Sequence, residues 1–419
     1  MSVAVPQPGG DAAQAAARGT PRAGVISLTP FLCFLAAFFL PMKALRLSIG
    51  QLSLYLPFFA IGLAALLAPR ALAGIGLRFF AGPFLVLLGF TLLDFARAGF
   101  DPSVFVFTFK ILIMLAMAAT YYWLLRCDET AVMRALSWGI YATVAFMLYQ
   151  YVSVTFFHQA LPLTTVQGLE IGRGIGGRYG FTRVTGFTEE PSYVAVMLLG
   201  SLFLLRSYQQ RSGVSQRRTI GVIVAGLLLC TSNSLFAALP ILLLFSLFYR
   251  LRITWLFFVV FYAANLLIYP IVLNRDETFF ARFSSYSQFA ALPPDQKILG
   301  IGFNQYATLE LPQFVNALGI TTQIVESLGS LWGGLLLEGG IIFTVIFCLY
   351  VDHLIRGARW GTGYALMAIL IMLANYYSPW WPIVSLALAY VLYSRAPFRA
   401  GRAGARRTAL KEKEDNIPT

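Results

Sequence analysis

The sequence predicts an all-α, polytopic integral membrane protein with about twelve transmembrane helices and two long outer loops. Of its 419 residues, 58% are hydrophobic and only 12% are charged. The apolar residues fall in long blocks, and a helix of about 20 such residues crosses a hydrocarbon core roughly 30 Å thick. Because a helix satisfies its own backbone hydrogen bonds, which lipid cannot do, these blocks are expected to be helical.

The blocks recur along most of the chain. Their approximate bounds are 26–40, 52–67, 79–93, 104–125, 132–157, 191–205, 220–230, 235–249, 253–272, 331–350, 364–376 and 379–393. Only the short polar run 231–234 divides the seventh block from the eighth. Around a single membrane domain over residues 26–394, we expect a disordered cytoplasmic tail over 1–25 and a basic cytoplasmic tail over 395–419.

Basic residues set the expected orientation, because short loops rich in Lys and Arg stay in the cytoplasm. With the N-terminus inside, most of the 31 Lys and Arg residues face the cytoplasm, and both termini are cytoplasmic. The net charge of +13 is then explained by topology and by contact with anionic lipids of the inner leaflet. Membrane lipids are therefore expected partners, and nucleic acid is not.

Two long outer loops, about 158–190 and 274–329, hold most of the remaining polar residues. The first is rich in glycine and carries Arg173, Arg178 and Arg183 at every fifth position. Guanidinium groups bind phosphate oxygens in bidentate fashion, and a helix start offers free N–H groups to an anion. The loop therefore suits a phosphorylated substrate held in the membrane, with contact to solvent or lipid headgroups as the alternative.

Glu190 stands directly before Pro191, where the next apolar block begins. A residue before proline avoids the helical region, and proline favours the first helical turn, so Glu190 is expected to be an N-cap. Whether it serves only as a cap or also as a base stays open. Glu338 falls inside the block 331–350, where a carboxylate is costly, so it is expected to face a substrate cavity or to make a structural hydrogen bond.

Three stretches of the sequence resemble one known family. The run RVTGFTEEPS over residues 183–192 is similar to the Arg-x-x-Gly-x-x-x-Glu-Pro-Ser segment of bacterial polysaccharide polymerases of the Wzy type. The run RFS over 282–284, followed by ILGIGFN over 298–304, resembles the R-x-S … G-x-G outer loop of that family, and residues 330–340 look like the helix that closes the loop. Together with the hydropathy pattern, the resemblance spans roughly residues 26–393. In these stretches the chain is similar to the superfamily of O-antigen polymerases and ligases.

The resemblance implies a glycosyltransferase of the bacterial inner (cytoplasmic) membrane. Such an enzyme polymerises oligosaccharide repeat units linked to undecaprenyl pyrophosphate into an O-antigen or an exopolysaccharide, at the periplasmic face and without a cofactor or a metal. Its partners are the lipid-linked glycan and, in the same pathway, a chain-length regulator and a flippase. The four scattered cysteines and two histidines likewise suggest no metal site.

Residue roles follow from the same resemblance and from the chemistry that it requires. Pyrophosphate binding falls to the basic residues of the two loops, which are Arg173, Arg178, Arg183, Arg282 and, as a further candidate, Lys297. Glu190 is the favoured base and Glu326 the second candidate, because the acceptor hydroxyl must lose a proton. Glu338 is a candidate for substrate binding.

Other functions remain open. An O-antigen ligase would share the donor site, but ligases usually carry a His-Asn pair where this chain has Gly329 and Ser330. The run 231–234 also lacks the Ser-Arg pair of many relatives. A flippase or transporter of lipid-linked oligosaccharides would be expected to place its charges near the bilayer midplane. A non-catalytic component that only holds the glycan lipid is a further alternative.

Overall fold

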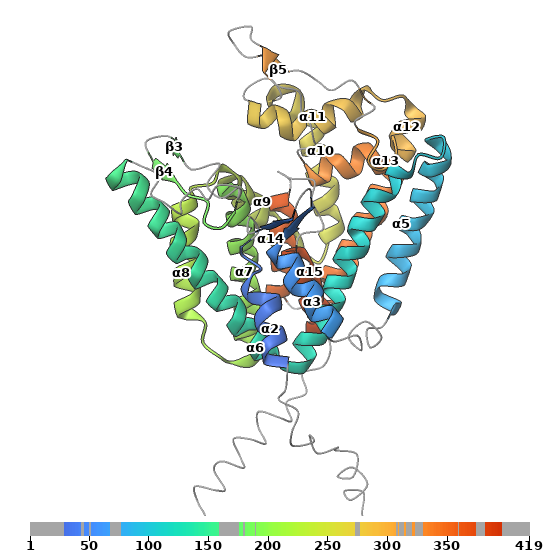
Figure 1. Ribbon diagram of the computed structural model, residues 1–419. Coiled ribbons are helices and arrows are strands. Elements are labelled where there is room, and N and C mark those ends of the chain that lie inside the picture. The colour runs from blue at the N-terminus through green and yellow to red at the C-terminus, as the bar shows by residue number, and fades with distance from the viewer. Residues whose placement is uncertain are drawn as a thin grey trace, which may run out of the picture.

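The computed structural model describes residues 29–42, 46–49, 52–67, 77–158, 176–178, 181–188, 190–272, 277–306, 309, 314–315, 321–322, 330–358, 360–373 and 382–395. Over these residues the chain is mostly helical, and its long helices stand side by side as a bundle (Figure 1). Candidate residues Arg173 and Glu326 lie outside the described residues.

The helices follow the predicted apolar blocks. They are α2 (Thr29–Phe38), α3 (Leu56–Leu67), α5 (Leu77–Arg97), α6 (Phe105–Phe157), α7 (Pro191–Ser212), α8 (Arg217–Cys230), α9 (Asn233–Arg250), α10 (Thr254–Val272), α13 (Leu331–Arg356), α14 (Trp360–Met372) and α15 (Pro382–Arg395). Among the described residues, four helices are long and apolar enough to cross a membrane, over Pro102–Phe157, Pro191–Ser212, Thr254–Ile271 and Leu331–Arg356. The protein is therefore a mostly helical protein with membrane-spanning character.

The longest helix, α6, is in fact two helices joined at a bend. Asp128 has a non-helical backbone (φ −156°, ψ 89°), and Figure 1 shows the two halves diverging from this point as the arms of a V. The bend lies between the predicted blocks 104–125 and 132–157, as the polar residues between them indicate. A short 3-10 turn, η1 (Pro102–Val104), leads into α6.

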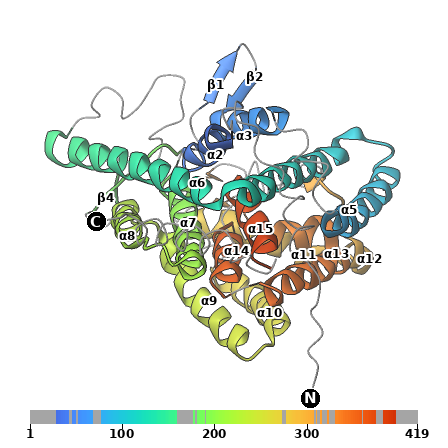
Figure 2. The ribbon, with the colours of Figure 1, turned by 90° about the horizontal axis from the view of Figure 1, so that it is seen from below.

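Two helices near the C-terminus form the centre of the bundle. All described side chains of α14 from Gly361 onward are buried, as are those of α15 up to Leu392, and Figure 2 shows both helices surrounded by the others. Small residues allow this close packing. A Cβ on Gly200 of α7 would lie 2.6 Å from a side-chain carbon of Ile369 in α14.

The structure fits the predicted all-α class, and the described residues also contain three short two-stranded hairpins. They are β1 (Arg46–Ile49) with β2 (Leu52–Tyr55), β3 (Gly176–Arg178) with β4 (Phe181–Arg183), and β5 (Phe314–Val315) with β6 (Thr321–Thr322). The predicted span 52–67 was therefore wrong at its start, where residues 52–55 form a strand. Alternating Ser and apolar residues, with Ser48 opposite Ser53, fit the two-residue period of a strand.

The second outer loop also contains more regular structure than predicted. It holds α11 (Glu277–Ala291) and α12 (Pro294–Leu299), both packed on α13. Tyr286 and Phe289 of α11 lie three positions apart and form a buried cluster with Leu336 and Leu337 of α13, which explains why this segment folds against the bundle.

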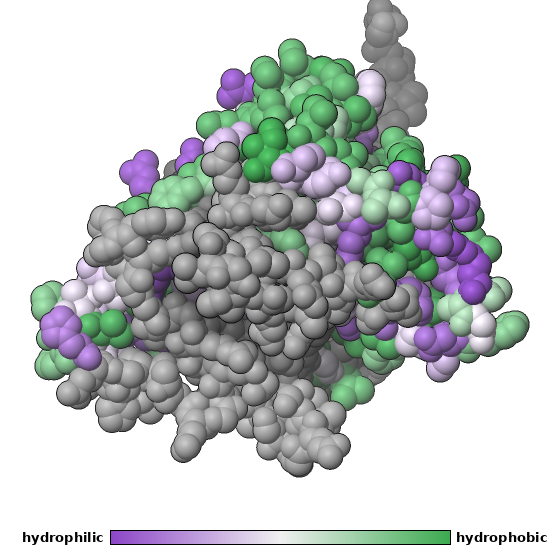
Figure 3. All heavy atoms as spheres, turned by 90° about the horizontal axis from the view of Figure 1, so that it is seen from above, coloured by the Kyte–Doolittle hydropathy of each residue, from purple (hydrophilic) through white to green (hydrophobic). Residues whose placement is uncertain are grey.

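The two ends of the bundle carry different structural elements. The upper end in Figure 1 carries the β3–β4 hairpin, α11 and α12. The lower end carries the α6 bend at Asp128 and the α7–α8 junction at Gly213. Seen from above, hydrophilic described residues lie toward the margins of the upper face, and a hydrophobic area lies along one edge (Figure 3).

Candidate functional site

The β3–β4 hairpin brings two of the candidate arginines to the upper end. Its antiparallel register pairs Gly176 with Arg183 and Arg178 with Phe181, so the two arginines lie two register positions apart on neighbouring strands. Strand β4 packs against α6 and α8. The Arg183 side chain is half-buried, and it lies within electrostatic range of Cys230 at the end of α8.

The segment after Arg183 is anchored to α6 by Gln150. The Oε1 atom of Gln150 accepts hydrogen bonds from the backbone N–H groups of Thr185 at 3.2 Å and Gly186 at 2.8 Å. Its Nε2 donates to the Gly186 carbonyl at 3.2 Å. Gly186 has a φ of +59°, which favours glycine, and its Cα approaches Met147 so closely that a Cβ would lie 3.0 Å from the Met147 side chain. Arg183 is therefore followed by a fixed turn.

The turn delivers Glu190 to the start of α7. Thr188 Oγ1 lies within hydrogen-bond distance of the carbonyls of Thr185 at 2.7 Å and Glu190 at 2.9 Å. Glu190 is the N-cap of α7, with extended backbone (φ −138°, ψ 153°) and Pro191 following, as predicted. Its exposed carboxylate makes no capping hydrogen bond, and Oε2 instead accepts from the Ser192 hydroxyl at 3.2 Å. The carboxylate therefore contacts the first turn of α7 through the Ser192 side chain.

The junction between α8 and α9 lies beside this segment, since Arg183 is near Cys230. Thr231 has a φ of +38°, and Ser232 is the N-cap of α9. Ser232 is 1% exposed, and within the described part of the chain the hydroxyls of Thr231 and Ser232 have no hydrogen-bond partner. These two buried hydroxyls belong to the run 231–234, which lacks the Ser-Arg pair.

Candidates from the second loop form a separate group at the same end. Arg282 is half-buried on α11. Ser285 of the same helix packs so closely on α13 that a Cβ on Gly333 would lie 2.9 Å from the Ser285 Cβ. Lys297, on α12, is also half-buried. Ser330 caps α13, where its Oγ accepts from the Gly333 N–H at 3.2 Å.

The G-x-G run of the second loop fills a break in α13. Gly340 has φ +66° and ψ −173°, which interrupts the helix. The freed carbonyls of Leu337 and Glu338 accept hydrogen bonds from the N–H groups of Ile301 at 3.1 Å and Gly302 at 3.0 Å. The loop therefore replaces the missing helical donors.

Glu338 lies at this break and is 0% exposed. Its backbone holds the G-x-G run, and its side chain is enclosed within the bundle.

A carboxylate of α5 secures the same loop from the other side. Asp94, which follows the predicted span 79–93, accepts a hydrogen bond from the Phe303 N–H at 3.1 Å and pairs with Arg97 at 3.5 Å. Arg97 in turn donates to the Gly300 carbonyl at 3.1 Å. Burial raises the pKa of Asp94 to about 6, although the Phe303 hydrogen bond and Arg97 oppose the shift.

Comparison with known proteins adds no assignment: no protein-family model matches the chain, and no curated protein matches it significantly. Among the described residues, no group of three or more His, Cys, Asp or Glu side chains could hold a metal ion.

The geometry therefore offers two groups of candidates at the upper end. Arg178 on β3, Arg183 on β4 and Glu190 at the start of α7 form the first group. The α11–α13 region carries Arg282, Lys297 and Glu338. Sequence reasoning missed Gln150 and Asp94, whose partners lie far away along the chain.

Proposed function

We propose that this protein is a membrane glycosyltransferase that polymerises repeat units linked to undecaprenyl pyrophosphate, without a metal, at the periplasmic face of the bacterial inner membrane. The observation that supports this proposal is the turn at Thr185 and Gly186, which Gln150 anchors at one end of an apolar helical bundle. A guanidinium, Arg183, and an exposed carboxylate, Glu190, stand seven positions apart in the sequence on either side of this turn.

The chemistry proposed for this segment is a direct displacement. Arg183, with Arg178 on the neighbouring strand, binds the pyrophosphate of the donor and stabilises the charge that develops on it. Glu190 takes the proton of the acceptor hydroxyl, whose oxygen attacks the anomeric carbon of the donor sugar. The bond between that carbon and the pyrophosphate oxygen breaks, and the lipid pyrophosphate leaves with the bonding electrons.

The proposal includes about twelve spans, with both termini in the cytoplasm and two periplasmic loops. A helix occupies each predicted block, which supports this number. Arginines gather where the helices meet at the lower end, as short cytoplasmic connections require. They include Arg126, Arg134, Arg206, Arg217, Arg218, Arg250, Arg252 and Arg356.

Purified protein in proteoliposomes, given only lipid-linked repeat units and a metal chelator, tests the proposal. We expect a ladder of glycans that grows with time, without nucleotide. Movement of the substrate across the bilayer without chain growth would instead identify a transporter. Transfer of glycan only after a lipid A core is added would identify a ligase.

A further inference from the structure

The lower end of the bundle contains a cavity that the proposed reaction does not use. It has a volume of about 630 Å³ and lies between the second half of α6 and the start of α8. Arg134, Arg217 and Arg218 line it, together with Trp138 and Tyr141. All three arginine side chains are exposed, so their guanidinium groups are accessible to a ligand.

The charge of this cavity is not balanced by its own walls. The described residues that line it include three arginines and no carboxylate. The nearest carboxylates in sequence belong to the α6 bend, and both have other partners. Asp128 Oδ1 accepts a hydrogen bond from the Ala131 N–H at 2.9 Å.

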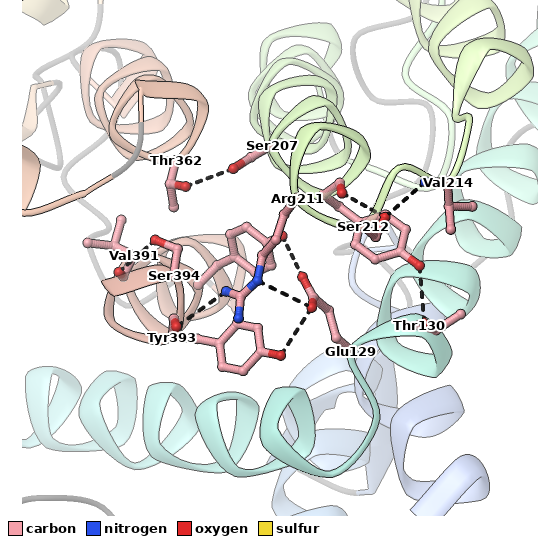
Figure 4. A network of polar contacts seen from close by, with 12 residues as sticks. Glu129, Thr130, Ser207, Arg211, Ser212, Val214, Thr362, Val391, Tyr393 and Ser394 are labelled. Carbon is pink, nitrogen blue, oxygen red and sulfur yellow. Dashed lines mark hydrogen bonds and ion pairs between the residues drawn. The ribbon is translucent and has the colours of Figure 1, made fainter. Parts of the chain in front are cut away.

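Glu129 points away from the cavity, toward α7 and α15 (Figure 4). Its oxygens accept hydrogen bonds from the hydroxyls of Tyr390 at 2.7 Å and Tyr393 at 3.0 Å. The Arg211 guanidinium lies 3.7 Å from the same carboxylate and stacks over the Tyr393 ring at 4.1 Å. This network neutralises the charge of Glu129 within the protein. The three arginines that line the cavity can therefore bind an anion from outside the protein.

Hydrogen bonds between helices fix the walls of the cavity. The Tyr208 hydroxyl of α7 donates to Thr130 Oγ1 of α6 at 3.2 Å (Figure 4). The hydroxyls of Tyr141 in α6 and Thr219 in α8 are 2.7 Å apart. Both pairs belong to the lining of the cavity, so its shape is set before a ligand binds.

Exposed apolar stripes lead from the arginines toward the upper end. On α6, Trp138 and Leu148 are 57% and 53% exposed, and they follow Arg134 at helical spacing. On α8, Val224 and Leu228 are 46% and 71% exposed, and they follow Arg217 in the same way. At about 1.5 Å per residue, α8 rises roughly 16 Å from Arg217 to Leu228, close to half the thickness of a hydrocarbon core.

We propose that this cavity binds the phosphate headgroup of an anionic phospholipid, whose acyl chains lie along the exposed stripes of α6 and α8. Three guanidinium groups match a phosphodiester, the exposed Trp138 indole suits the interface between headgroup and acyl chain, and the stripes match the depth of one leaflet. The site is independent of the glycosyl transfer, and it requires only that these helices lie in a membrane.

Lipid binding to the purified full-length protein in mixed micelles tests the site. The probes are phosphatidylglycerol, phosphatidylcholine and inorganic phosphate. We expect phosphatidylglycerol to bind the wild-type protein roughly 10-fold more tightly than phosphatidylcholine, because each surface arginine adds to the attraction. Inorganic phosphate at millimolar concentration should not compete. Full competition by phosphate would assign the cavity to a free anion and overturn the lipid proposal.

A matched pair of double variants localises the effect. Arg134→Gln with Arg217→Gln removes two cavity arginines, and we expect it to abolish the preference for phosphatidylglycerol. Arg126→Gln with Arg206→Gln removes two exposed arginines of the lower end that do not line the cavity, and the preference should persist. Equal effects of the two pairs would mean that the preference comes from general surface charge.

A second measurement leaves all arginines in place, so its result does not depend on whether the arginine variants fold. Phosphatidylglycerol with brominated acyl chains should quench tryptophan fluorescence more strongly in the wild-type protein than in Trp138→Phe. Brominated phosphatidylcholine should give a smaller difference between these two proteins. An equal difference with both lipids would contradict a specific headgroup site next to Trp138.

Discussion

The side chain of Gln150 holds the backbone of Gly186 by hydrogen bonds in both directions, at 2.8 Å to its N–H and 3.2 Å to its carbonyl. Gln150 is fully buried in α6, and Gly186 lies between Arg183 and Glu190. The position of the candidate site therefore depends on one buried amide.

Replacing this amide should damage the site more than the fold. Gln150→Leu would leave the N–H groups of Thr185 and Gly186 without their Gln150 partner, at about 1–3 kcal/mol for each buried group. The Gly186 carbonyl would keep the hydrogen bond from the Thr185 hydroxyl. We expect at least a tenfold loss of polymer per folded molecule and a lower unfolding temperature. Polymer is measured by glycan electrophoresis and stability by thermal unfolding in detergent.

The matched control is Gln209→Leu, which removes an amide that accepts one hydrogen bond, from the Gln216 N–H at 3.3 Å, at the lower end. Polymer yield should be close to wild type. If the two variants gave equal yields, Gln150 would not position the site.

The break in α13 should tolerate no side chain. A Cβ on Gly340 would lie 2.3 Å from the Gly300 nitrogen. The φ and ψ of Gly340 are also accessible essentially to glycine alone. We expect Gly340→Ala to lower the free energy of unfolding by about 3 kcal/mol or more. Gly221→Ala in α8 is the control, because nothing lies within 4 Å of its Cβ position and alanine favours a helix. Thermal unfolding that ranked the two variants equally would contradict the loop-in-break geometry.

Asp94 should make stability depend on pH. Its pKa is about 6 in the folded protein, against a usual value of 3.8, because the side chain is buried. The folded state thus binds this proton more tightly than the unfolded chain, and the free energy of unfolding falls as pH rises from about 4 to about 6. Asp94→Asn, which resembles the protonated acid, should remove this part of the slope in thermal unfolding across that range.

Asp101 supplies a control with the opposite sign. Hydrogen bonds from the side chain and the backbone of Ser103 lower its pKa, so its contribution to stability is present at neutral pH and lost as pH falls. If Asp94→Asn and Asp101→Asn changed the slope in the same direction, the burial argument for Asp94 would be wrong.

Cysteine labelling should report the orientation of the bundle. Cys127 is exposed at the α6 bend of the lower end, whereas Cys33, Cys230 and Cys348 are buried. With this end in the cytoplasm, a membrane-impermeant maleimide should label the protein in inside-out vesicles and leave it unlabelled in intact spheroplasts. Cys127→Ser should lose the label. Labelling from outside the cell would reverse the proposed topology.

The sequence predicted most helices because their signal is local. Long apolar blocks specify α6, α7, α10 and α13, the polar run between two blocks locates the Asp128 bend, and Pro191 fixes Glu190 as an N-cap. These features depend only on neighbouring residues, so composition and order suffice to find them.

The contacts that position the site could not be predicted in the same way. Gln150 meets Gly186 across 36 positions, and Asp94 meets Phe303 across 209. Residues 52–55 were expected to be helical, but they pair as a strand with Arg46–Ile49. Each of these depends on a partner that only the folded chain brings near.

Polymer formation by arginine variants in proteoliposomes supplied only with lipid-linked repeat units tests the central proposal most directly. We expect Arg183→Ala to abolish chain growth, and Arg183→Lys to lower it at least tenfold, since an ammonium cannot replace a bidentate guanidinium. Arg206→Ala, at the lower end, should behave as wild type. Near-normal polymer length from Arg183→Ala would contradict the proposed pyrophosphate site.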